Sequence, residues 1–74
     1  SAQAADQTIE NDILEAIKRS TRVDTDKIGI DVTRGVATLT GFVADSDQYR
    51  AVEDIAFFTR GVVDVKNDLQ IRKA

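Results

Sequence analysis

The sequence contains no cysteine and no histidine, the residues on which most zinc sites and many catalytic centres depend. Without cysteine there is neither a disulfide framework nor a thiolate nucleophile. Without both residues, zinc and other soft or borderline metal sites are not expected, and triads with a histidine base are ruled out. The lack of cysteine leaves the compartment open, because many proteins of oxidising compartments also lack it.

Several other features of binding proteins are missing. The four glycines are scattered, so they form no glycine-rich phosphate loop and no Gly-x-x-Gly signature of an RNA-binding KH domain. Lysine and arginine form no run, and the formal net charge of −3 argues against a nucleic-acid partner. No apolar run approaches the roughly 18 to 20 residues of a membrane span.

Carboxylates are present but suggest no chemistry. Pairs such as Asp45 and Asp47 suit helix caps and surface charge better than acid–base catalysis. The segment from Asp24 begins like a calcium loop, but Ile28 and Gly35 occupy positions that need acidic ligands. The sequence therefore predicts no enzyme, no catalytic residue, no cofactor site and no metal ligand.

The 74 residues suffice for one small domain, which would bury about 60% of the surface of its unfolded chain. Residues 1–5 have the small-residue, Ala-x-Ala character found around secretory cleavage sites. We expect these five residues to be a disordered leader, with a weak hint of export, and residues 6–72 to form the single domain.

The segment Ile28–Val43 is predicted to be a β-hairpin. Apolar and polar residues alternate on both sides of Arg34-Gly35. A two-residue loop there pairs the flanking residues so that both apolar sets share one face, whereas a slip of one residue would turn one set to water. The predicted pairs are Thr33–Val36, Val32–Ala37, Ile30–Leu39 and Ile28–Gly41. The small residues of this face, Ala37 and Gly41, leave room for a helix.

Two segments have the periodicity of amphipathic helices. The first runs from Asp6, a candidate N-cap, to about Ser20, and the second begins near Asp45 and stops at Gly61 as its C′ glycine. Gln48 stands three residues after Asp45, as in a capping box. The predicted buried positions are Ile9, Ile13 and Ile17 in the first helix and Val52, Ile55, Ala56 and Thr59 in the second, with Tyr49 at the edge.

A third strand completes the pattern. Its apolar residues, Val63, Val65, Leu69 and Ile71, alternate with polar ones and are predicted to share one face. Asn67 interrupts this set, which is typical of a bulge or an exposed edge position. Residues 72–74 are expected to be loose.

The order helix, strand, strand, helix, strand predicts an α+β fold. Two amphipathic helices on one face of a three-stranded sheet with one apolar side make a two-layer sandwich. The second and third strands should run parallel, because a helix connects them. The order of the strands across the sheet stays open.

Phe57 and Phe58 do not fit the buried stripe of the second helix. At about 100° per residue, Phe57 points well away from that stripe and Phe58 lies on its flank. We expect Phe57 to be exposed and Phe58 to be about half exposed, with Phe42 on the side of the sheet away from the helices. The pair is either packed locally or a contact surface for lipid or another protein.

The motifs together resemble a known family. The hairpin Gly35–Val43 reads Gly-Val-Ala-Thr-Leu-Thr-Gly-Phe-Val, and it is followed by Ala51, Ile55-Ala56, Gly61-Val62, Val65, Asn67 and Leu69. This spacing resembles the BON domain, and in particular the BON domains of osmotically inducible periplasmic proteins. The resemblance implies a non-enzymatic module of the bacterial envelope, associated with osmotic stress, transport assemblies and attachment to phospholipid.

The resemblance also bears on single residues. Gly35, Gly41 and Gly61 match the glycines of the family, and we expect them to have structural roles. Phe57 and Phe58 depart from it, because related sequences usually carry polar or small residues there. We therefore expect a periplasmic module that attaches weakly to a phospholipid surface or an envelope protein through its second helix. The alternative is a self-association or protein–protein module of a larger transport-associated protein, using the same phenylalanines or the edge of the third strand.

Overall fold

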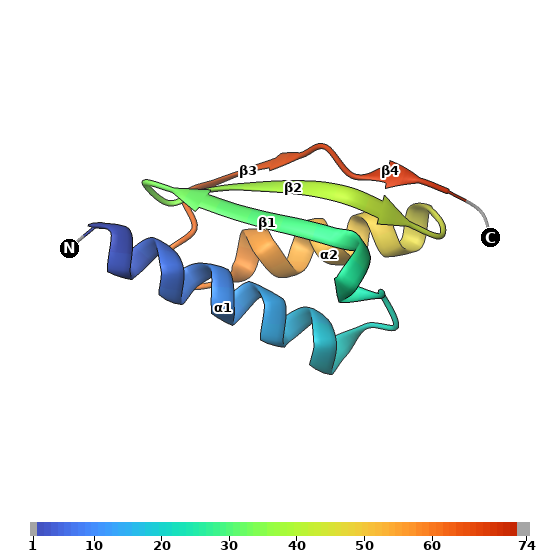
Figure 1. Ribbon diagram of the computed structural model, residues 1–74, viewed down its shortest axis with the longest axis horizontal. Helices are drawn as coiled ribbons and strands as arrows, with labels where there is room; N and C mark the ends of the chain where they lie inside the picture. The colour runs from blue at the N-terminus through green and yellow to red at the C-terminus, as the bar shows by residue number, and fades with distance from the viewer. Residues whose placement is uncertain (1, 73–74) are drawn as a thin grey trace.

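The computed structural model describes residues 2–72, with side chains from Ala5 onward. Its elements are α1 (Ala2–Ser20), the short 3₁₀ helix η1 (Thr25–Lys27), β1 (Ile28–Thr33), β2 (Val36–Val43), α2 (Ser46–Phe58), β3 (Asp64–Asn67) and β4 (Gln70–Ile71). Both helices lie on one face of the sheet, and the other face is uncovered (Figure 1). The predicted α+β two-layer sandwich is confirmed.

The hairpin of β1 and β2 has the predicted register. All four predicted pairs occur, from Thr33 with Val36 at the turn to Ile28 with Gly41. Arg34 and Gly35 both have positive φ, at 53° and 81°, as the two central residues of a type I′ turn require. Arginine therefore takes a position where asparagine is more usual, and the apolar pattern of the strands fixes the pairing.

β2 is the central strand of the sheet. β1 pairs antiparallel on one side of it, while β3 and then β4 pair parallel on the other. The predicted parallel direction is confirmed, and the strand order, which the sequence left open, is β1–β2–β3. β3 and β4 are thus two pieces of the third strand, separated by Asp68 and Leu69.

Asn67 is the last residue of β3, before the gap that separates β3 from β4, and its side chain contacts α2. Its Oδ1 accepts a hydrogen bond from the Leu69 N–H at 3.0 Å, and its Nδ2 donates to the Tyr49 carbonyl and the Glu53 carboxylate at 3.4 and 3.3 Å. The pairs Leu39–Asn67 and Phe42–Gln70 are equally spaced on both strands, so no residue is inserted. The gap is therefore not a bulge: the Asp68 N–H still donates to the Leu39 carbonyl of β2 at 2.8 Å, and the Asn67 side chain links this edge of the sheet to α2.

The third strand is covered in its middle and exposed at its two ends. Leu69 is buried and Val65 half-buried, as predicted, but Val63 and Ile71 are exposed. The predicted apolar face is therefore not buried at these two ends: Val63 lies before β3, and Ile71 lies in the two-residue strand β4 at the edge of the sheet.

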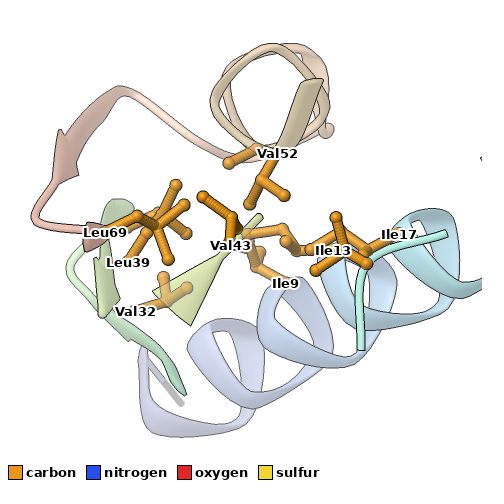
Figure 2. Close-up of a cluster of buried hydrophobic side chains, with 11 residues drawn as sticks. Ile9, Ile13, Ile17, Val32, Leu39, Val43, Val52 and Leu69 are labelled. Atoms are coloured by element: carbon orange, nitrogen blue, oxygen red, sulfur yellow. The ribbon is translucent and has the colours of Figure 1, made fainter. Parts of the chain in front are cut away.

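The core lies between the helices and the sheet. Figure 2 shows the isoleucines of α1 pointing toward Val52 of α2 and toward the inner face of the strands. The predicted positions of both helices are confirmed as buried or half-buried. The buried residues are Ile9, Ile13, Ile17, Val23, Val32, Ala37, Leu39, Val43, Val52, Ala56 and Leu69. Spacings of three and four residues therefore place each helix correctly on the sheet.

Asp6 does not cap a helix. α1 begins at Ala2, four residues before the predicted start, so Asp6 lies inside it. Its carboxylate accepts hydrogen bonds from the backbone N–H groups of Arg34 and Gly35, at 3.0 and 3.3 Å. Asp6 therefore binds the hairpin turn to α1. Residue 1 lies outside the described residues, and the division into a leader and a domain stays a prediction.

This contact gives a first testable prediction. Asp6→Ala should lower the free energy of unfolding by about 1 kcal/mol, because two turn N–H groups lose a charged acceptor while alanine slightly favours the helix. Asp12→Ala, an exposed aspartate of the same helix, is the control and should be neutral or slightly stabilising. Urea denaturation followed by circular dichroism measures both. Equal effects of the two substitutions would show that the contact contributes nothing.

Candidate contact surface

The C-terminal end of α2 carries two exposed aromatic side chains. Val52 and Ala56 on the same helix are fully buried. Phe57 follows about 100° further around the helix and is 55% exposed, while Phe58 is 80% exposed. Phe57 is thus exposed as predicted, and Phe58 is more exposed than the half that we expected.

The two rings contact each other. Their centroids lie 5.3 Å apart and their planes are nearly perpendicular, at 87°. This edge-to-face geometry is favourable for aromatic pairs. The pair therefore forms a small preformed apolar projection, whose outer surface faces solvent.

The chain leaves α2 through a tight turn. Helix α2 ends at Phe58, and the Thr59 hydroxyl donates to the Ile55 carbonyl at 2.6 Å. A β-turn follows, closed by a 3.1 Å hydrogen bond from the Val62 N–H to the Thr59 carbonyl, with Gly61 at φ 97°. The prediction that Gly61 is the C′ residue of the helix was wrong. Gly61 is instead the left-handed residue of the next turn.

This turn packs against the hairpin turn. The Val63 N–H donates to the Gly35 carbonyl at 2.8 Å, and a Cβ atom at Gly35 would lie 3.1 Å from the Gly61 carbonyl oxygen. Two of the three family glycines thus meet here. Val63 is 72% exposed, so a further apolar side chain lies in the segment between α2 and the sheet.

A hollow of about 500 Å³ lies at the other end of α2. The loop before β1, the ends of β2 and β4, and the start of α2 surround it. Its charged lining residues are Arg22, Lys27, Arg72 and Asp24. The sequence did not predict this group, because its cations are spread along the chain and meet only when the strands pair.

Arg72 is ordered, although the sequence predicted a loose end. Its backbone N–H donates to the Val43 carbonyl at 2.8 Å, and its guanidinium carbon lies 4.0 Å from the centroid of the Phe42 ring. Phe42 lies on β2 and is half-buried. This cation–π contact restricts the motion of the guanidinium group. Residues 73 and 74 of the predicted loose end lie outside the described residues.

Asp24 is a helix-capping residue. It is the N-cap of η1, and its Oδ1 accepts a hydrogen bond from the Asp26 N–H at 3.0 Å. Across the described part of the chain, no three carboxylate side chains converge in a way that could hold a metal ion.

The fold and these motifs agree with one protein family. The family model of the BON domain matches residues 5–73, nearly the whole chain. The chain belongs to the BON domain family. BON domains are non-catalytic binding modules and are typical of envelope proteins. No curated protein matches this sequence.

The BON motif residues have clear structural roles here. The glycines at 35 and 61 form the two turns that meet beside the start of β3, and the asparagine at 67 connects the third strand to α2. The phenylalanines at the end of α2 are not part of the motif. In residues 2–72, neither helix has the length and apolarity that crossing a bilayer requires.

Proposed function

We propose that this BON domain is a binding module of the bacterial envelope that attaches reversibly to a phospholipid surface through Phe57 and Phe58. The observation that carries the proposal is the exposure of both rings at one helix end, although the core beside them is complete. Exposed aromatic side chains at the end of an amphipathic helix are typical of proteins that bind the membrane interface. The resemblance of the hairpin motif to osmotically inducible periplasmic proteins supports a periplasmic role in osmotic or envelope stress.

The attachment should be weak. Full burial of a phenylalanine side chain is worth about 1.5 to 3 kcal/mol, and two rings that are already partly covered would gain less than twice this amount. A single myristoyl chain gives marginal binding, so two rings give a peripheral, reversible contact. The net charge of −3 further opposes binding to anionic lipid at low salt.

Co-sedimentation with vesicles tests the proposal. Phe57→Ser/Phe58→Ser should reduce pelleting with phosphatidylcholine vesicles at least about fivefold, because the apolar area that enters the interface is lost. The matched control is Val36→Ser/Ile71→Ser, which removes two exposed apolar residues outside α2 and should leave pelleting unchanged. Negligible pelleting of the wild type, or equal pelleting of wild type and the phenylalanine variant, would contradict the lipid contact.

The same two rings also support a second function, association with another protein chain. An edge-to-face aromatic pair is a favourable anchor for a protein interface. Sedimentation equilibrium of the wild type and of Phe57→Ser/Phe58→Ser measures self-association in the absence of vesicles. Concentration-dependent dimers that the double substitution abolishes would favour a protein–protein module over lipid attachment.

A further inference from the structure

The hollow at the start of α2 gathers positive charge on a chain that is negative overall. Three cationic side chains and one carboxylate line it, while the whole chain carries −3. Within residues 5–72, none of the three cations forms an ion pair. The one carboxylate of the lining, Asp24, already accepts a hydrogen bond from the backbone of η1. The hollow therefore has an excess of positive charge and unused donors.

Arg72 contacts an aromatic ring at the hollow. Its guanidinium group stacks on the Phe42 ring, which leaves the N–H groups at the edge of the plane free. The edge of a guanidinium group suits two oxygens of one phosphate or carboxylate group. Arg22 and Lys27, which come from the loop before β1 and from η1, face the same hollow and add charge from other sides.

The start of α2 contributes a neutral donor. Gln48 also lines the hollow; its Oε1 accepts a hydrogen bond from the Ala44 N–H at 2.8 Å, while its Nε2 has two further donor hydrogens. The helix terminus itself adds little, because the Asp45 carboxylate already accepts the Gln48 N–H at 2.8 Å. Asp45 and Asp47 place negative charge near this side, so the opposite wall with its cations must supply the attraction.

We propose that this hollow binds a phosphate group carried by a small organic molecule or by a lipid headgroup, with Arg22, Lys27 and Arg72 as its ligands. Three cations around one hollow match a phosphate better than a carboxylate, because a phosphate offers more oxygens and more charge. A volume of about 500 Å³ exceeds that of the ion alone and leaves room for a glycerol- or sugar-sized body. The proposal is independent of the lipid contact at Phe57 and Phe58, which lie about 15 Å further along the axis of α2.

Nitrogen-15 NMR titration with glycerol 3-phosphate tests the site. We expect saturable shifts of the amide signals of 22–27, 42–48 and 70–72. Arg22→Gln/Lys27→Gln/Arg72→Gln should weaken binding at least about tenfold, because each lost cation is a charge-assisted partner. The matched control, Arg50→Gln/Arg60→Gln/Lys66→Gln, removes the same charge from exposed positions outside the hollow and should bind like the wild type.

Two further variants separate the contributions. Phe42→Leu keeps every charge and removes the ring under Arg72, so it should weaken binding about threefold. Phe57→Ser/Phe58→Ser should bind glycerol 3-phosphate like the wild type, whatever it does on vesicles. If the phosphatidylcholine co-sedimentation experiment fails, the expected binding of glycerol 3-phosphate is therefore unchanged.

Vesicles of phosphatidylglycerol distinguish the two sources of the phosphate. A response to both glycerol 3-phosphate and vesicles, with both lost in the cation variant, supports a site for phosphate groups in general. A response to one of them, lost in the same variant, supports the corresponding source. No saturable response of the wild type to either, or an equal loss in the control variant, would overturn the proposal.

Discussion

Gly41→Ala is expected to lower the free energy of unfolding by at least about 3 kcal/mol. Gly41 has φ 105°, a conformation that strains any residue with a Cβ atom. A Cβ atom there would overlap the Lys27 carbonyl oxygen and lie 2.7 Å from the Ile28 Cα atom. Both neighbours belong to the backbone that enters β1, so neither can rotate away.

The cost is large for a domain of this size. A 74-residue domain has a total stability of about 4 to 11 kcal/mol, so the substitution should remove much of it. Urea denaturation followed by circular dichroism measures the loss. The sequence suggested that Gly41 leaves room for a helix; the structure corrects this, because the close neighbours of Gly41 belong to η1 and β1.

Gly29→Ala is the matched control for this experiment. Gly29 pairs with Thr40, one step from the pair of Ile28 and Gly41. A Cβ atom at Gly29 would lie 2.7 Å from the Thr40 hydroxyl oxygen, which can rotate. The expected change is within about 1 kcal/mol. Equal destabilisation by the two substitutions would contradict the argument from backbone contact.

Ile13→Ala should cost about 3 to 4 kcal/mol. Ile13 is fully buried in the middle of the α1 stripe, between Ile9 and Ile17 (Figure 2). Truncation removes three buried carbon atoms and leaves a cavity, because the surrounding core can close only in part. Alanine favours the helix slightly more than isoleucine does, and this gain offsets only a fraction of the loss.

The adjacent Leu14 provides the control. It has the same number of atoms as Ile13, lies on the same helix and is half-buried. Leu14→Ala should therefore cost about 1 kcal/mol. Thermal and urea denaturation measure the free energy of unfolding of both variants. Similar losses of stability in the two variants would mean that α1 does not pack on the core through Ile9, Ile13 and Ile17.

The two candidate sites differ in how far local pattern predicted them. The exposure of Phe57 follows from its angle on the helix relative to Val52 and Ala56, so the sequence predicted it. Phe58 is more exposed than predicted, because α2 ends at this residue and no later helical turn covers it. The hollow beside Arg72 was not predicted, because its lining depends on the pairing of β4 with β2.

The sequence by itself determined the hairpin register and the buried face of each helix. These features depend on residues a few positions apart, and a shift of one residue would expose an apolar set to water. The tertiary structure alone decided the strand order, the contact of Asp6 with the hairpin turn and the role of Asn67 beside α2. Each of these depends on atoms that are distant along the chain, and their approach is fixed only when the two layers pack together.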